Sequence, residues 1–313
     1  MMTKLLLTAA AAAIAIGVAP AAFAQDSTTV PDTAAPASEA PASQYPSPAM
    51  DRDARPFSGL YVAASGGYDI QGNDIGSRIQ FDRNGDGRFG DGITDQVSTT
   101  TGADAFSPGY CNGRAYNSSP LRGCENDRNR ASYYGRVGFD VQRGHFVLGA
   151  LGEFGKTEIK DYVSGFSTTP AFYTLERSVK WEASARLRAG VAFGEGPQAG
   201  LFYATGGAGY ADVRHRFFTN NTANAFSDNG DDKKWGFIVG GGVEKFLTRN
   251  ISIGAEYTYH DYKDGDYRVQ VTRGTAPATN PFVLAPNTGG TTIRRADDNF
   301  RWHSLRGTIG FHF

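Results

Sequence analysis

Apolar and polar residues alternate with a period of two in short segments of the chain from about residue 57 onward. In Trp181–Phe193, for example, every second residue is apolar, whereas the positions between them include Glu182 and Arg186. This period places the two kinds of side chain on opposite faces of a β-strand. Clusters of glycine, proline and asparagine separate the segments, as is typical of turns between antiparallel strands. The pattern predicts an all-β fold.

Eight of these segments are long enough to cross a membrane as tilted strands, which need about 9–11 residues each. They are residues 57–70, 131–142, 145–160, 177–194, 200–217, 234–247, 250–264 and 299–313. The connections between them are alternately long and short, and the longest lie at 71–130 and 265–298. We therefore expect residues 57–313 to form an eight-stranded antiparallel up-and-down transmembrane β-barrel.

The alternation of side chains does not by itself distinguish a membrane barrel from a soluble sheet, because a soluble sheet would turn its charged face to water. The sorting of the connections by length favours the barrel. Bacterial outer-membrane barrels have short periplasmic turns and longer outer loops. We expect the two longest connections to be outer loops and both ends of the barrel to lie in the periplasm.

The N-terminal part differs from the rest of the chain. Residues 1–24 combine Lys4, an apolar run and the small-residue ending Ala22-Phe23-Ala24, which predicts a secretory signal peptide and a mature chain that begins at Gln25. Residues 25–56 are rich in proline, alanine, serine and threonine and carry few large apolar side chains. Such a segment cannot bury enough surface to fold, so we expect a disordered periplasmic tether.

Charge and cysteine content narrow the function classes. The formal net charge is −1, which gives no basic field of the kind that nucleic-acid binders use, so we expect no nucleic-acid partner. Cys111 and Cys124 are the two cysteines of the sequence. In an exported chain an even cysteine count favours a disulfide, here within the first long outer loop, over two unpaired thiols.

One hairpin carries a specific family resemblance. Trp235–Asp264, WGFIVGGGVEKFLTRNISIGAEYTYHDYKD, resembles the penultimate hairpin of small outer-membrane barrels of the OmpA-like and porin-like surface-antigen superfamily. Gly59-Leu60-Tyr61 with Gly66-Gly67-Tyr68, and Leu201-Phe202-Tyr203 with Gly206-Gly207, resemble the first and fifth strands of that group. The resemblance implies a protein of the cell outer membrane, in contact with outer-membrane lipid and lipopolysaccharide.

The end of the chain adds to this resemblance. Phe313 is the last residue and Phe311 lies two positions earlier, as in many substrates of the outer-membrane barrel assembly machinery, which we expect to act on this strand. Full-length OmpA-like proteins continue into a peptidoglycan-binding domain, and we expect none here. The outer loops resemble nothing that would name an extracellular ligand.

Eight charged residues lie on the polar face of their strands, where they alternate with the apolar positions, and are expected to line the lumen. They are Arg136, Glu153, Glu182, Arg186, Arg188, Glu244, Glu256 and Arg306. Charges of both signs enclosed together will pair, because an isolated buried charge is costly. The set fits either a gated ion path or a salt-bridged plug. We favour the plug, because eight strands enclose an interior that side chains can just fill.

Aromatic residues near the strand ends are expected to form girdles at the two membrane interfaces. These are Tyr133, Tyr134, Trp181, Phe193, Tyr203, Trp235, Tyr257, Tyr259, Trp302, Phe311 and Phe313. His303 and Ser304 invite comparison with outer-membrane lipid A hydrolases, which use a histidine and a serine near the membrane edge. Adjacent strand residues point to opposite faces and cannot act as a nucleophile and base, so we expect no enzyme activity.

The first outer loop contains the opening of an EF-hand-type calcium motif, D-x-N-x-D-G. The candidate ligands are Asp82, Asn84, Asp86, Arg88 and Asp91. The twelfth position is Ile93 rather than the glutamate that usually closes such a site. A hydrated cluster of turn residues is therefore the favoured interpretation. We expect no required cofactor, with Ca²⁺ as the one ion that this motif suggests.

These features together predict a barrel with a structural and surface-interaction role in the cell envelope. The alternative is a narrow porin-like channel for ions or small solutes.

Overall fold

The computed structural model describes residues 55–72, 78–90 and 96–313. The predicted signal peptide and nearly all of the predicted tether lie outside the described residues. The described residues belong to one compact unit, Pro48–Phe313. They form strands and three short 3₁₀ turns. None of the described segments forms a helix of the length and hydrophobicity that a membrane crossing requires.

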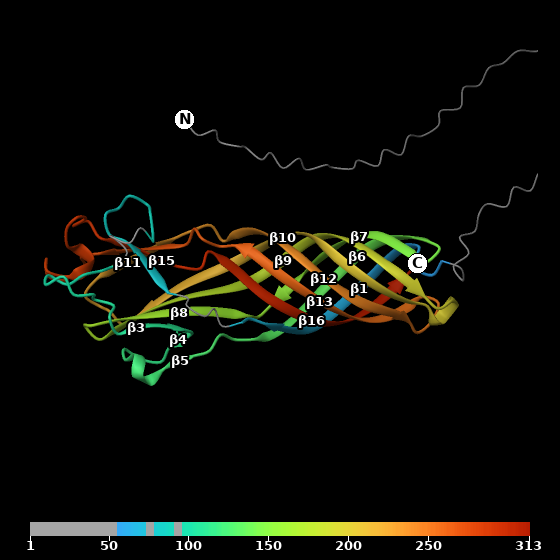
Figure 1. Ribbon diagram of the computed structural model, residues 1–313, viewed down its shortest axis with the longest axis horizontal. Helices are drawn as coiled ribbons and strands as arrows, with labels where there is room; N and C mark the ends of the chain where they lie inside the picture. Colours follow the sequence, from blue (N-terminus) through green and yellow to red (C-terminus); the bar gives the residue numbers. More distant parts are fainter. Residues whose placement is uncertain (1–54, 73–77, 91–95) are drawn as a thin grey trace, which may run out of the picture. The chain divides into compact units, whose positions relative to one another are not determined.

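Eight long strands close into an antiparallel barrel (Figure 1). They are β1 (Gly59–Ile70), β6 (Arg130–Arg143), β7 (Phe146–Thr157), β9 (Ala171–Phe193), β10 (Gly200–Thr219), β12 (Lys233–Phe246), β13 (Ile251–Lys263) and β16 (Asn299–His312). Each strand pairs with the next one in this order, and β16 pairs with β1 to close the ring. Closure satisfies the strand edges, which would otherwise stay unpaired. The eight-stranded barrel predicted from the sequence is confirmed.

Tight connections gather at one end of the barrel and long ones at the other. The β6–β7 turn is closed by Gly144, whose φ of +57° lies in the left-handed region that residues with a Cβ seldom adopt. The β9–β10 connection contains the short turn η2 (Gly196–Gln198), and β12 and β13 are joined by four residues. We call this the tight-turn end, and the opposite end the long-loop end.

The barrel wall is apolar outside and polar inside. Side chains exposed on its outer face include Val62, Phe139, Leu187, Val191 and Ile309, each between 38% and 71% exposed. Charged residues between them in sequence, such as Arg186 and Arg188, are buried inside. This is the opposite of a soluble barrel and matches an outer surface solvated by lipid.

A β-bulge in β9 interrupts the alternation of its faces. Asp212 of β10 lies opposite Trp181, but the next residue, Val213, lies opposite Val179, so Lys180 has no partner in the register. In β9, even-numbered residues after the bulge, such as Arg186, face the lumen. Before the bulge the odd-numbered residues, such as Arg177, face inward instead. An extra residue shifts the alternation by one.

Two of the predicted boundaries differ from the structure. Residues 161–176 were expected to be a loop, but they belong mostly to β8 (Lys160–Ser167) and to the first residues of β9. The predicted third strand, 145–160, is divided between β7 and β8. In β9 the bulge inverts the alternation of the residues before Lys180, which hides the N-terminal part of this strand from a pattern with one fixed period.

The long connections also contain ordered strands rather than irregular loops. In a four-stranded sheet, β11 (Ala225–Asn229) pairs with β14 (Arg268–Thr272), which is followed by β15 (Thr291–Arg295) and β2 (Ile79–Asp82). On the barrel sheet, β3 (Gly109–Asn112) pairs with β8, which lies beside β9. We call this strand-rich part, including the small pair β4 (Arg114–Ala115) and β5 (Cys124–Glu125), the extension.

The two sheets of the extension share one hydrophobic core. It contains Ile79, Phe81, Val97, Ala105, Phe106, Val163, Ala171, Tyr173, Leu175, Tyr267, Val269, Val271, Phe282 and Ile293, with Phe282 supplied by the turn η3 (Pro281–Val283). Figure 1 shows β3, β11 and β15 together at the long-loop end, away from the C-terminus. The strands of the four-stranded sheet are only four or five residues long, too short for the alternation to reveal them in the sequence.

Candidate functional site in the barrel lumen

The structure brings the eight predicted lumen charges into the interior of the barrel. Their exposed fractions lie between 1% and 8%. They come from β6, β7, β9, β12, β13 and β16, so the network links nearly the whole circumference.

Five of them form a central cluster of three arginines and two glutamates. The Arg136 Nη2 atom lies 2.6 Å from Glu153 Oε2 and 2.7 Å from Glu256 Oε1. Arg186 contacts the same two glutamates at 3.0 and 3.3 Å. Arg306 donates to Glu153 at 2.9 Å. Each carboxylate is thus shared by more than one guanidinium, and removal of one partner would leave another charge buried without compensation.

A second cluster lies closer to the tight-turn end. Arg188 donates to Asp140 and, at 2.6 Å, to Glu244 Oε2. Its guanidinium lies 4.9 Å from the ring centres of both Tyr61 and Tyr203. The two aromatic faces and two carboxylates therefore hold one cation in place.

Two members of this cluster were not among the predicted lumen charges. Asp140 has the same parity as Arg136 on β6, and His312 contacts Glu244 Oε1 at 2.9 Å. The parity rule, applied to every charged residue of each strand, would have found both.

The remaining predicted charge, Glu182, accepts hydrogen bonds mainly from neutral groups. Tyr134 and Tyr262 donate hydroxyl hydrogen bonds at 2.7 and 2.5 Å, and His260 Nδ1 lies 2.8 Å away. The Trp302 indole stacks on His260 with ring centres 4.6 Å apart. Glu182 thus lies at the boundary between the central charged cluster and an aromatic layer.

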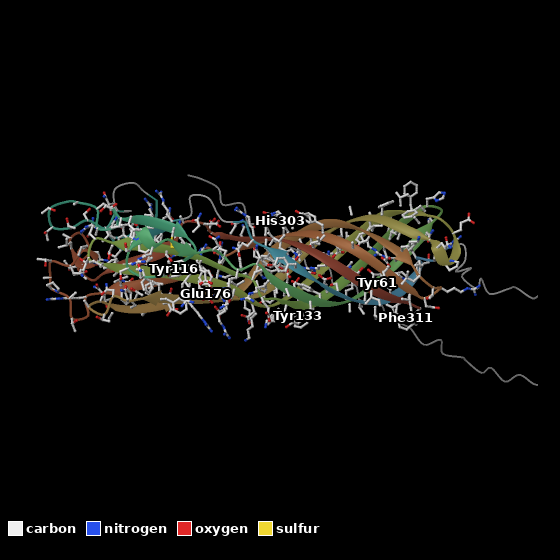
Figure 2. All side chains as sticks on the ribbon, turned by 90° about the horizontal axis from the view of Figure 1, so that it is seen from below. Tyr61, Tyr116, Tyr133, Glu176, His303 and Phe311 are labelled. Carbon is white, nitrogen blue, oxygen red and sulfur yellow. A yellow bond between two sulfur atoms is a disulfide. The ribbon has the colours of Figure 1, made fainter. Side chains whose placement is uncertain are left out.

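Three residues predicted for the aromatic girdles instead face the lumen. Tyr134, Tyr203 and Trp302 are 5%, 7% and 0% exposed. Their neighbours in sequence, such as Tyr133 at 53%, lie outside, and Figure 2 shows Tyr133 and His303 at the outer face of the wall. The prediction used position near a strand end and ignored parity, which decides the face.

Apolar side chains close the lumen at its tight-turn end. Phe57, Val147, Leu201 and Phe246 are 0–2% exposed and belong to one cluster. The rings of Phe57 and Phe246 lie 4.9 Å apart. Glycines make room for large side chains elsewhere in the interior: a Cβ on Gly209 would overlap the Tyr262 hydroxyl.

A second apolar layer separates the central cluster from a further set of charges. It contains Ile159, Val179, Ala211, Val213, Tyr262, Phe300 and Trp302. Beyond it, Arg177 contacts Asp161 at 2.5 Å, Asp297 at 3.2 Å and Asp264 at 3.4 Å. This cluster was not predicted, because residues 161–176 were expected to be a loop and a fixed period does not allow for the bulge.

Asp264 lies just after β13 and is surrounded by basic side chains. His215 Nε2, Lys234 Nζ and Arg177 Nη1 lie 2.8, 3.3 and 3.4 Å from its carboxylate oxygens. Burial alone would raise the pKa of Asp264, but the hydrogen bond and charge of His215 and the charges of Arg177 and Lys234 outweigh it and lower the pKa to about 2. The carboxylate therefore stays ionised.

The two cysteines form a disulfide in the extension, as predicted. Cys111 on β3 and Cys124 on β5 have Cα atoms 6.4 Å apart. The bridge ties the segment between them, whose Leu121 side chain is 95% exposed, to the sheet that continues the barrel.

The predicted calcium motif folds as a set of side-chain to backbone turns. The Asp82 carboxylate accepts from the backbone N–H groups of Gly85 and Gly87, at 2.7 and 2.9 Å. Asn84 accepts from Asp86, and Asp86 accepts from the N–H of Arg88. Asp91 lies outside the described residues, and within the described ranges no group of three or more acidic, histidine or cysteine side chains could hold a metal ion. Calcium binding stays a prediction.

His303 and Ser304 point to opposite faces of β16. His303 is exposed and its Nδ1 lies 2.6 Å from the Tyr257 hydroxyl, whereas Ser304 is buried and donates to Asp69. The structure does not bring the two side chains together.

A family model described as "Outer membrane protein beta-barrel domain" matches residues 96–276, more than half of the chain. This chain belongs to that outer-membrane β-barrel family. The family localises it to the cell outer membrane, where the apolar outer face of the barrel contacts lipid and lipopolysaccharide. In bacterial barrels of this class the tight turns are periplasmic and the long loops lie outside the cell.

Curated relatives agree with this assignment. The chain is 32% identical over 145 residues to the "22 kDa outer membrane protein" of Rhizobium leguminosarum bv. viciae, a match that covers 45% of this chain and 58% of the relative. It is 29% identical over 115 residues to the "31 kDa outer-membrane immunogenic protein" of Brucella melitensis and of Brucella suis, with 37% of this chain and 46% of each relative covered. The chain thus spans about half the length of these relatives.

Among solved structures, the chain is similar to the outer membrane protein OprG from Pseudomonas aeruginosa. The sequence identity is 12% and the TM-score is 0.43, over 82% of this chain and 96% of OprG.

Proposed function

We propose that this protein is a non-conducting barrel with a structural and surface-interaction role in the cell envelope. The filled lumen is the observation that carries this proposal. Apolar and charged layers alternate along it, from the Phe57 cluster through the Arg188 and Arg136 clusters and the Trp302 layer to the Arg177 cluster. An ion would have to displace paired charges and apolar side chains in turn to cross it.

The extension, which we infer to lie outside the cell, supports the surface-interaction part of the proposal. Strands β9 and β10 contain 23 and 20 residues, about twice the 9–11 that a membrane crossing needs, so much of each strand lies beyond the lipid. The extension has its own apolar core and a disulfide. A binding surface on such a scaffold loses little conformational entropy when it meets a partner. The Brucella relatives are named outer-membrane immunogenic proteins.

Two further parts of the proposal concern enzymes and assembly. We infer no catalytic role, because His303 and Ser304 face opposite sides of the wall; lipid A from cells that overexpress the protein should keep its mass spectrum. We also infer that the barrel assembly machinery acts on β16, which ends at His312 immediately before the exposed Phe313. Deletion of Phe313 should reduce the folded fraction in cells.

The rival function is a narrow channel, and one observation favours it. Several buried donors in the lumen, Arg186 Nε and Nη1, Arg188 Nε and Arg306 Nε, have no hydrogen-bond partner among the described residues. Such atoms need water, and a hydrated interior is the starting point for conduction.

Single-channel recording in planar lipid bilayers separates the two functions. We expect the refolded protein to give no discrete current steps in potassium chloride. The variant Phe57→Ala/Phe246→Ala removes apolar side chains that close the lumen at the tight-turn end. It tests whether any current passes through the lumen. Steps in the parent that grow in this variant would establish the channel and overturn the proposal, whereas a silent parent and a silent or leaky variant support the closed barrel.

A further inference from the structure

A row of contacting aromatic rings lies on the outer face of the barrel. Phe154 contacts Trp181, Trp181 contacts Tyr210, and Tyr210 contacts Trp235, with ring centres 5.9, 5.8 and 4.7 Å apart. Tyr133 on β6 lies opposite Lys156, which is two residues along β7 from Phe154. Aromatic rings of this kind prefer the level of lipid headgroups. We call these five residues the outer girdle.

A groove of about 510 Å³ opens on the outer face, on the extension side of the outer girdle. It is lined by Arg130, Lys156, Thr157, Glu158, Ile159, Lys160, Glu176, Ser178, Val179, Lys180, Arg214 and Arg216. Arg214 lies four residues beyond Tyr210 of the girdle, or about 13 Å along the strand. Figure 2 places Glu176 between Tyr133 on the barrel and Tyr116 on the extension. The groove is therefore at the height of the headgroups and the first sugars of the outer leaflet.

The groove carries a positive charge that its own carboxylates leave uncompensated. It contains six cationic side chains and two glutamates, in a protein whose formal net charge is −1. Glu158 lies 3.5 Å from Lys156, and Glu176 lies 3.1 Å from Lys160.

The other four cations of the groove are less closely paired with carboxylates. Arg130, Arg214 and Arg216 are exposed and have no carboxylate within ion-pair distance in the described part of the chain, and Lys180 has only a 4.0 Å contact with Asp212. Three arginines without an acidic partner among the described residues and one weakly paired lysine are thus presented on one face.

The bulge at Lys180 builds this arrangement. Because the register shifts there, Lys160, Ser178 and Arg214 fall in one row across β8, β9 and β10, and Tyr162, Glu176 and Arg216 fall in another. The rows between them, such as Asp161, Arg177 and His215, face the interior. The bulge itself turns Lys180 outward, where its side chain is 57% exposed.

We propose that this groove binds the phosphorylated headgroup of lipid A in the outer leaflet. Arginine and lysine side chains bind phosphate oxygens through charge-assisted hydrogen bonds, and arginine can bind two oxygens at once. A lipid whose acyl chains lie along the outer girdle would bring its phosphates to Lys156 and Lys180 first and to Arg214 and Arg216 beyond them. The proposal requires only the outer-membrane location, so a conducting lumen would leave it intact.

The test compares lipid A binding by the folded full-length barrel in detergent, measured by native mass spectrometry. The probes are bisphosphorylated lipid A, the same lipid A after enzymatic dephosphorylation, and phosphatidylglycerol. We expect the parent to bind the bisphosphorylated form about tenfold or more tightly than the other two, with affinity that falls as salt rises. The variant Arg130→Gln/Arg214→Gln/Arg216→Gln should lose that preference.

A matched variant controls for loss of charge alone. Arg122→Gln/Arg143→Gln/Lys245→Gln removes three exposed cations outside the groove and should bind like the parent. All six substituted side chains are exposed, so we expect each variant to fold, and a gel-mobility shift on boiling verifies this. Equal binding of phosphorylated and dephosphorylated lipid A, equal binding of phosphatidylglycerol, or equal loss in both triple variants would each overturn the proposal.

Discussion

Arg136 and Glu256 are joined by two hydrogen bonds across the lumen, from Nη1 at 3.0 Å and from Nη2 at 2.7 Å, although they are 120 residues apart in the chain. Their strands, β6 and β13, are separated in the sheet by β1 and β16. The contact therefore spans the interior rather than following the wall. The side chains that fill the lumen therefore also help to hold the ring of strands closed.

Removal of one member of this network should destabilise the barrel. In Glu256→Ala, Arg136 and Arg186 lose a shared carboxylate inside a buried cluster, which typically costs about 3–5 kcal/mol. The urea midpoint of the barrel in lipid vesicles should fall accordingly, while insertion still occurs. Lys245→Ala, on the exposed face of β12, is the control and should leave the midpoint unchanged. An unchanged midpoint in Glu256→Ala would show that the network does not stabilise the fold.

Closure of the ring should make the protein heat-modifiable on gels. Strands β1 and β16 pair without a break from Tyr61 opposite His312 to Ile70 opposite His303. A barrel without free edges should stay folded in cold detergent and migrate differently after boiling. If the cold and boiled samples of inserted protein migrate together, the ring is not closed in solution.

The disulfide should protect the extension from proteolysis, whereas the stability of the barrel should not depend on it. Its ends are 13 residues apart, and closure of a loop of this length stabilises a folded state by about 3 kcal/mol in a chain-entropy treatment. In Cys111→Ser/Cys124→Ser, trypsin should cut faster at Arg114 or Arg122, whereas the gel-mobility shift on boiling should stay that of the parent. Cleavage at the parent's rate would mean that neighbouring contacts alone order the segment. Full thiol labelling of unreduced parent protein would exclude the bridge itself.

Asp264 should make the stability of the extension depend on acid pH. Because the folded-state pKa of about 2 lies below the ordinary aspartate value of 3.8, the ionised form stabilises the fold by about 2 kcal/mol at neutral pH. This contribution is complete above the unfolded pKa and is lost as the pH falls through about 2. Asp264→Asn should therefore lower the urea midpoint, followed by near-ultraviolet circular dichroism, at pH 7, and the difference from the parent should shrink towards pH 2.

The matched control for this prediction is Asp266→Asn, whose carboxyl is half exposed and should contribute little. A difference between Asp264→Asn and the parent that is as large at pH 2 as at pH 7 would assign the effect to packing rather than to charge.

Much of the barrel follows from local physics that one sequence displays. A strand that separates lipid from a polar interior must alternate, and the alternation of Trp181–Phe193 is enough to predict that Arg186 and Arg188 face the interior, where both are buried. The contrast between tight and long connections predicts the up-and-down order of the strands. The presence of two cysteines in an exported chain also favours the bridge between Cys111 and Cys124.

The sequence itself determined which face each regular strand residue takes, because side-chain direction follows from a fixed period of two. Only the tertiary structure decided where that period breaks, since the bulge at Lys180 is defined by its register against β10 and not by any property of lysine. The same holds for Arg177 and Asp264, which meet because β9 and the segment after β13 converge inside the extension. The groove formed by Arg130, Arg214 and their neighbours also exists only once strands distant in sequence are side by side, because its charge depends on register across several strands.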